Sequence, residues 1–90
     1  MPQPDPIPEL KVAAAAALAR RIAHWSSAYD AAAALCTDRS RIYDIRQGRL
    51  TRFSLEMLLR LLVRAGARVE LRILDPTFRA RDRATVIDAE

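Results

Sequence analysis

The chain is poor in the residue types from which metal sites and catalytic centres are commonly built. It has one cysteine and one histidine among 90 residues, which excludes an internal disulfide, a zinc finger and the common kinds of Cys–His nucleophile pair within one chain. Its acidic residues fall on separate predicted helices, and no nucleophile–base pair can be named. We therefore predict that the chain is not an enzyme, binds no metal and needs no cofactor.

Long apolar runs are also missing. The apolar stretch at residues 12–19 is alanine-rich, is flanked by Lys11 and Arg20, and falls short of the roughly 18 residues that a membrane-spanning helix needs. The first residues lack the basic and apolar regions of a secretory signal. We expect no membrane contact, and a lone cysteine fits a reducing, cytoplasmic setting.

What the chain does have is alanine and an uneven distribution of charge. Seventeen alanines against five aromatic residues favour closely packed helices in one small domain. The net charge is +4, but residues 1–38 and 73–90 each carry −1, whereas residues 39–72 hold nine arginines and three acids. A basic middle third between acidic ends predicts a localised surface that faces a polyanion.

Periodicity and capping residues predict four helices. The proline-rich segment over residues 1–8 is expected to be flexible, extended or disordered, and the first helix starts at Pro8 or Glu9 and runs to about Trp25. The other three helices are predicted over residues 28–35, 39–47 and from 55 to Gly66. Each follows a residue whose side chain can accept a hydrogen bond at a helix N-terminus, and these N-cap residues are Ser27, Asp38 and Ser54 in turn. Gly48 ends the third helix as a C′ glycine.

The hydrophobic period changes to two at residues 69–73. Val69, Leu71 and Ile73 fall on one face and predict a short strand with that face buried. One strand leaves its edges unpaired, so we expect it to pair with the same strand of a second copy and form a homodimer. The predicted domain spans residues 9–75, and residues 76–90 are expected to form a loosely ordered tail.

The second and third predicted helices have the pattern of a helix-turn-helix. Both are short, a turn of three or four residues joins them, and in such a motif the second helix enters the DNA major groove. Ala32 allows the two helices to approach closely, and Leu35 and Ile42 fall where their shared core belongs. Trp25 and Phe53 are expected to cover the core, with Cys36 as a small buried hydrophobe in the turn.

Four segments in this order resemble the XRE-type, lambda-repressor-like helix-turn-helix family, and within it the short HigA-type antitoxins. They are ALARRIA (17–23), IYDIRQGRL (42–50), RFSLEMLLRLL (52–62) and, after Gly66, VELRI (69–73). The resemblance implies a mainly α-helical, four-helix domain that binds a palindromic operator in double-stranded DNA as a homodimer. It further implies a repressor that is the antitoxin of a type II toxin–antitoxin pair, with a cognate toxin as partner and its own operon as target.

Two departures from the family pattern bear on DNA binding. Cys36 stands where the family usually has a glycine, at a position that often needs a positive φ. Ser27-Ala28 stands where the family usually has Thr-Gln, so only backbone N–H groups at the start of the second helix are left to reach a phosphate. The missing glutamine permits one alternative, a protein-interaction module that has lost DNA readout. Another alternative is a stand-alone controller or autorepressor of a phage or mobile element, with no toxin.

Position within the motif selects the residues that would contact DNA. The predicted base-reading residues lie in the first two turns of the third helix and are Arg39, Ser40, Tyr43 and Asp44. An acid facing DNA is unfavourable, so Asp44 is also expected to pair with Arg41 or to hold Arg39. The predicted phosphate contacts flank that helix and are Ser27, Ala28, Arg41, Arg46, Arg49 and Arg52.

Overall fold

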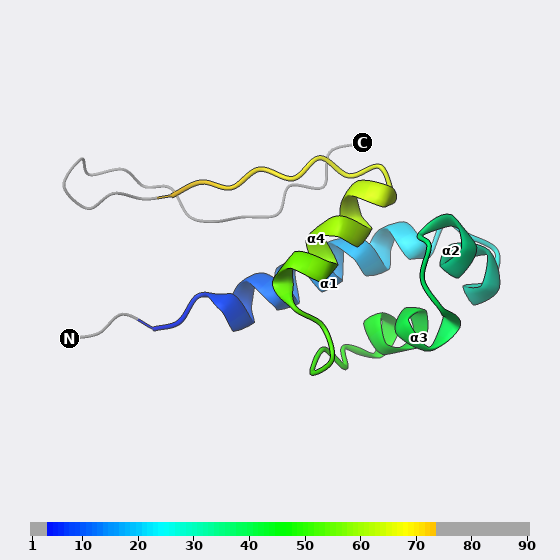
Figure 1. The fold of residues 1–90 in the computed structure, drawn as a ribbon, viewed down its shortest axis with the longest axis horizontal. Helices are drawn as coiled ribbons and strands as arrows, with labels where there is room; N and C mark the ends of the chain where they lie inside the picture. Colours follow the sequence, from blue (N-terminus) through cyan, green and yellow to red (C-terminus); the bar gives the residue numbers. More distant parts are fainter. Residues whose placement is uncertain (1–3, 74–90) are drawn as a thin grey trace.

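The computed structural model describes residues 4–73, and these fold into four helices (Figure 1). The helices are α1 (Ile7–Ile22), α2 (Ala28–Ala34), α3 (Arg39–Gln47) and α4 (Leu55–Arg64). The prediction of a mainly helical domain with four helices is therefore confirmed. The predicted tail at residues 76–90 lies outside the described residues.

Helix α1 differs from the prediction at both ends. It begins at Ile7, after Pro6 as the N-cap residue, and the Ile7 N–H donates a hydrogen bond to the Asp5 carboxylate at 3.0 Å. It ends at Ile22, and the Trp25 N–H bonds to the Ile22 carbonyl at 3.0 Å in a tighter turn. Trp25 still packs against the core, from the turn rather than from the helix. Because Trp25 continues the apolar spacing of α1, the helix predicted from the sequence was too long at its C-terminal end.

The three predicted N-caps are confirmed. The side chains of Ser27, Asp38 and Ser54 each accept a hydrogen bond at 3.0 Å from the backbone N–H three residues further on. Each cap of this kind stabilises a helix by about 1 kcal/mol relative to alanine. They set the starts of α2, α3 and α4 at the predicted residues.

Helices α2, α3 and α4 all end in a Schellman motif, in which a left-handed residue reverses the chain. The left-handed residues are Cys36, Gly48 and Gly66, with φ of 54°, 71° and 87°. In each motif the next N–H bonds to the carbonyl five residues back, at 2.8–2.9 Å. The turn residue Cys36 does adopt the positive φ that favours glycine. It is exposed, so the expectation of a buried cysteine is wrong, because the chain reverses here at the surface.

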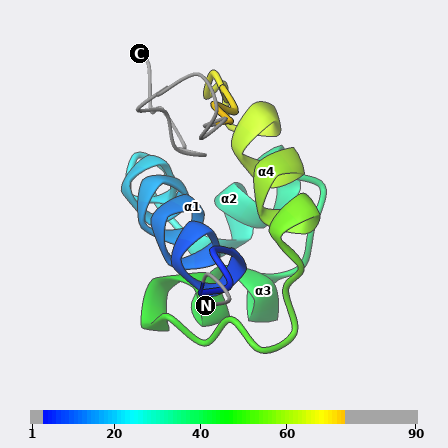
Figure 2. The same ribbon diagram turned by 90° about the vertical axis from the view of Figure 1, so that its left-hand side faces the viewer.

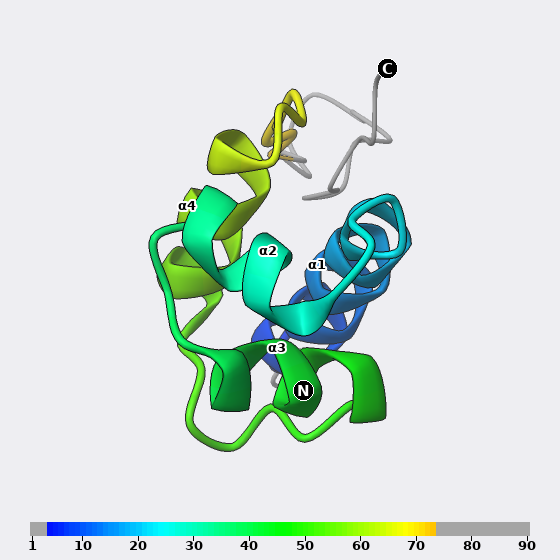
Figure 3. The same ribbon diagram turned by 90° about the vertical axis from the view of Figure 1, so that its right-hand side faces the viewer.

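The core lies between the helices and leaves α3 at one edge of the molecule. Helix α1 packs against α4 and α3, and α2 packs against α3. Figures 2 and 3 show α1 and α4 above α3 from two opposite sides. Phe53 is buried, as predicted. The largest fully buried side chains are Leu18, Ile22, Leu35, Ile42, Leu58 and Leu62.

The segment after α4 does not form a strand within the described residues, where Leu71 alone takes part in a β-bridge. Val69 is half-buried, whereas Leu71 and Ile73 are 69% and 75% exposed. Strand formation and pairing across a dimer therefore stay predictions. In this part of the chain, no helix combines the length and apolar character needed to cross a membrane.

Candidate DNA interface

Helix α3 divides cleanly into a buried and an exposed face. Ile42 and Ile45 point into the core, and Arg41 beside them is half-buried. Three predicted base-reading residues, Arg39, Ser40 and Tyr43, are exposed on the other side of the same helix. A helix with its side chains is about 10–12 Å in diameter, which suits insertion into a major groove about 12 Å wide.

The first turn of α3 is organised by the Asp38 carboxylate. Its Oδ1 accepts hydrogen bonds from the Ser40 hydroxyl at 2.6 Å and from the Arg41 N–H at 3.0 Å. The Ser40 hydroxyl, followed by the Arg41 N–H, holds the pKa of Asp38 below its usual value. Because its proton is used in this contact, the Ser40 oxygen is left with lone pairs and faces a ligand as an acceptor.

Asp44 is paired with Arg49 rather than with Arg41 or Arg39. Its Oδ1 lies 3.2 Å from the Arg49 Nε, and the side chain is 21% exposed. The pair joins the second turn of α3 to the residue after Gly48, where the Schellman motif turns the chain. A partly buried carboxylate with a guanidinium partner orients that guanidinium, which places Asp44 as a support for Arg49.

Arg41 is directed toward the protein. Its guanidinium carbon lies 5.2 Å from the centre of the Phe53 ring, and its Nη1 donates a hydrogen bond to the Arg52 carbonyl at 3.3 Å. Both contacts tie the loop between α3 and α4 to α3. Its predicted phosphate contact therefore competes with a role in shaping this loop.

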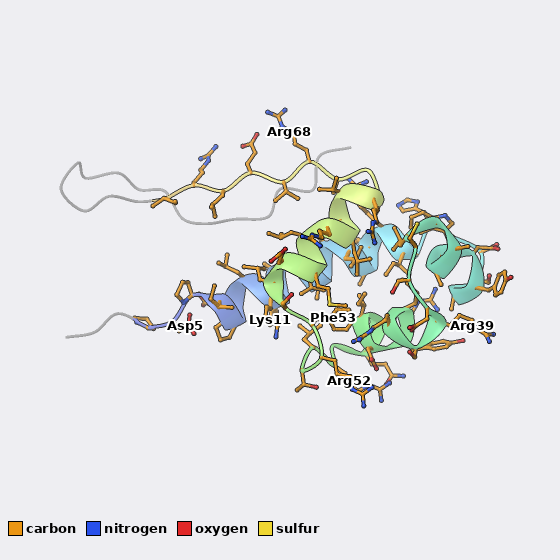
Figure 4. All side chains as sticks on the ribbon, in the orientation of Figure 1. Asp5, Lys11, Arg39, Arg52, Phe53 and Arg68 are labelled. Atoms are coloured by element: carbon orange, nitrogen blue, oxygen red, sulfur yellow. The ribbon has the colours of Figure 1, made fainter. Side chains whose placement is uncertain are left out.

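The loop carries the basic residues that follow α3. A groove lined by Ser40, Asp44, Arg49, Thr51 and Arg52 runs between α3 and the loop. The groove brings two predicted base-reading residues together with two residues predicted to contact phosphates. Thr51 was not predicted to belong to the site, because a threonine in a loop has no feature in the sequence that points to DNA. Figure 4 shows Arg39 near one end of α3 and Arg52 on the loop beyond its other end, both along the same edge of the molecule. Arg46, in the last turn of α3, is also exposed.

The start of α2 is less suited to a phosphate than predicted. The Ser27 oxygen is occupied as the N-cap, and the Ala28 side chain is buried. Asp30 lies in the same turn, and its Oδ2 accepts a hydrogen bond from the Ser26 hydroxyl at 2.8 Å. A phosphate approaching Ser27 and Ala28 would meet this negative charge.

Tyr29 is a candidate contact that was not predicted. The residue is 67% exposed, and the guanidinium carbon of Arg39 lies 5.9 Å from the centre of its ring. Helical spacing carried a signal for Tyr29. The buried positions of α2 are Ala28, Ala31 and Ala32, and this spacing leaves Tyr29 on the outer face of the helix, close to its start.

Two short helices, a left-handed turn between them and an exposed basic face on the second define the class of this protein as a helix-turn-helix DNA-binding domain. A family model described as a helix-turn-helix domain matches residues 1–74, and the chain belongs to that family. No curated relative and no solved structure matches the chain. A helix-turn-helix domain indicates a DNA-binding regulator, with double-stranded DNA as partner.

Proposed function

We propose that this protein is a sequence-specific transcriptional repressor that binds a palindromic operator as a homodimer. The observation that carries the proposal is the exposed face of α3, where Arg39, Ser40 and Tyr43 adjoin a loop rich in arginine. The XRE-type, lambda-repressor-like resemblance supports the same reading. Action on DNA by occupancy needs no catalytic group, so the proposal includes no enzymatic activity and no cofactor.

Arg39 is the principal base-reading residue in this proposal. A guanidinium at the first position of α3 can donate two hydrogen bonds to O6 and N7 of a guanine, worth roughly 1–3 kcal/mol of discrimination. Ser40, as an acceptor, suits the amino groups of cytosine or adenine, and Tyr43 suits a thymine methyl group or a phosphate. Asp44 acts through Arg49.

Phosphate contacts come from the basic end of the site. Arg46, Arg49 and Arg52 are exposed at the exit of α3, where the DNA backbone would pass. Each phosphate contact of this kind contributes about 0.9 to the slope of log affinity against log salt. Arg41, Ser27 and Ala28 contribute less, because the first is turned toward Phe53 and the other two lie beside Asp30.

The homodimer is proposed to form through residues 69–73. Leu71 and Ile73 expose alternate apolar side chains, which a second copy of the segment would cover. A two-fold axis through this pairing presents two α3 helices to DNA, and half-sites one helical turn apart require a spacing of about 34 Å.

The particular role proposed is that of a cytoplasmic antitoxin of the HigA type, which represses its own operon and binds a cognate toxin. This step is supported by the resemblance of four ordered segments, including RFSLEMLLRLL at residues 52–62. Co-expression with the neighbouring reading frame tests it. We expect that frame alone to arrest growth and this protein to relieve the arrest; a neighbour without toxicity would leave the stand-alone controller as the better account.

Selection of binding sites from random duplexes tests the DNA-binding proposal. We expect selected sequences to form a palindrome with half-sites about 10 base pairs apart, and the same palindrome to lie upstream of the gene. Affinity for it should fall steeply as salt is raised. Failure to enrich any sequence, with binding insensitive to salt, would favour the protein-interaction module.

A further inference from the structure

Tyr29 and Arg39 form a contact between the two helices of the helix-turn-helix. Tyr29 is in the first turn of α2, and Arg39 is the first residue of α3. The guanidinium carbon lies 5.9 Å from the ring centre, within the range of a cation–π interaction. Both residues are exposed, so the pair lies at the surface beside the predicted base-reading residues.

The surroundings of the pair leave room for this contact. Tyr29 and Arg39 line a shallow groove together with Ala32, Ala33, Thr37 and Asp38. Because alanine side chains are short, the two alanines of α2 leave space beside the Tyr29 ring. Asp38 precedes Arg39, and its Oδ1 accepts hydrogen bonds from the Ser40 hydroxyl and the Arg41 N–H.

From this geometry we propose that Tyr29 is a positioning residue that sets base specificity by holding Arg39 in the orientation for guanine. The inference rests on the proposed function, in which Arg39 reads a base. An aromatic ring contacts the flat face of a guanidinium. The N–H groups of the guanidinium point outward in its own plane and stay free to donate hydrogen bonds. Contact with Tyr29 therefore orders the side chain without using the donors that guanine needs.

Pre-ordering matters here because Arg39 is a long, exposed side chain at a helix N-terminus. An arginine free to sample its rotamers loses that freedom when it binds a base, which lowers affinity. The positive end of the α3 dipole gives a cation no compensating attraction. Because the Tyr29 ring already restricts the rotamers of Arg39 in the free protein, less side-chain entropy is lost when DNA binds.

The test compares Tyr29→Leu with Tyr29→Phe in the full-length protein. Leucine removes the ring, whereas phenylalanine keeps the ring and removes only the hydroxyl. We expect Tyr29→Leu to weaken operator binding roughly threefold per protomer and about tenfold for the dimer, and Tyr29→Phe to bind as the wild type does. The melting temperature of both variants should match the wild type, because the ring is exposed.

A second readout separates positioning from a general loss of affinity. Replacing the guanine that Arg39 contacts by 7-deazaguanine removes one acceptor, so the wild type should lose affinity for the modified operator. Tyr29→Leu should show a smaller penalty, and Tyr29→Leu combined with Arg39→Ala should bind no worse than Arg39→Ala alone. If Tyr29→Leu lowers stability, Tyr29→Met repeats the comparison with another side chain that lacks a ring.

The outcomes distinguish this inference from the function on which it rests. If Arg39→Ala abolishes the preference for guanine while Tyr29→Leu leaves affinity and the 7-deazaguanine penalty unchanged, Tyr29 has no positioning role and base reading stands. If Arg39→Ala itself leaves sequence preference unchanged, base reading by Arg39 is wrong and the inference fails with it. Equal losses in Tyr29→Leu and Tyr29→Phe would assign the effect to the hydroxyl and overturn the role of the ring.

Discussion

Replacing Cys36 by glycine should stabilise the domain. Cys36 is the left-handed residue of the Schellman motif that ends α2, with φ of 54°. A non-glycine residue in this conformation costs about 1–2 kcal/mol, because its Cβ crowds the backbone. Glycine removes that cost but adds about 0.4–1 kcal/mol of chain entropy to the unfolded state. Since the side chain is exposed, little packing is lost.

The net gain for Cys36→Gly is therefore about 0.5–1 kcal/mol, or roughly 2–8 °C in melting temperature for a domain of this size. Thermal and urea unfolding followed by circular dichroism, under reducing conditions, measures it. Cys36→Ala is the matched control, because it removes the thiol and keeps the strained backbone; its stability should stay within about 0.5 kcal/mol of the wild type.

The opposite effect on stability is expected at the end of α3. Gly48 has φ of 71°, and a Cβ built there meets no atom within 4 Å, so Gly48→Ala carries only the backbone cost. We expect it to lower stability by about 0.5–1 kcal/mol, from the same two opposing effects. Equal stability of Cys36→Gly and Cys36→Ala would show that the left-handed conformation at residue 36 carries no such cost.

Three further predictions concern pH, charge and assembly. Because the folded-state pKa of Asp38 lies below its ordinary value of 3.8, the charged cap stabilises the fold above that pH, and this stability is lost as pH falls through the lower folded pKa. Urea unfolding between pH 2 and 5 should show this dependence, and Asp38→Asn should remove its share of it. Arg49→Ala should reduce the salt slope of DNA binding by about one per protomer, whereas Arg60→Ala, which removes an exposed arginine paired with Glu56 on α4, should leave it unchanged in the same titration. Leu71→Pro should yield monomers in sedimentation equilibrium if residues 69–73 pair across the dimer; a variant that stays dimeric would point to α4.

The local features of the fold were predictable where a backbone group meets a side chain nearby in sequence. Asp38 and Gly48 bracket α3 at the predicted residues, because a cap and a left-handed glycine act over three to five residues. The end of α1 was missed, because Trp25 continues the apolar spacing while the backbone has already tightened into a turn. Residues 69–73 alternate as a strand does, but alternation alone supplies no partner within the described residues.

The site was predictable in its positions and not in its contacts. That Arg39, Ser40 and Tyr43 are exposed follows from helical periodicity once Ile42 and Ile45 are buried. The Asp44–Arg49 pair, in contrast, depends on how the chain turns after Gly48. The contacts of Arg41 and Tyr29 join separate elements, and sequence spacing carries no information on which side chains meet there.

Helix α3 is proposed to read DNA sequence through Arg39. The most direct test is the ratio of affinities for the selected operator and a scrambled duplex, measured by fluorescence anisotropy at one fixed salt concentration. The wild type should prefer the operator by about a thousandfold or more. Arg39→Ala should lower that ratio by roughly 30-fold or more, because a dimer loses two guanine contacts. A ratio unchanged by Arg39→Ala would contradict the account.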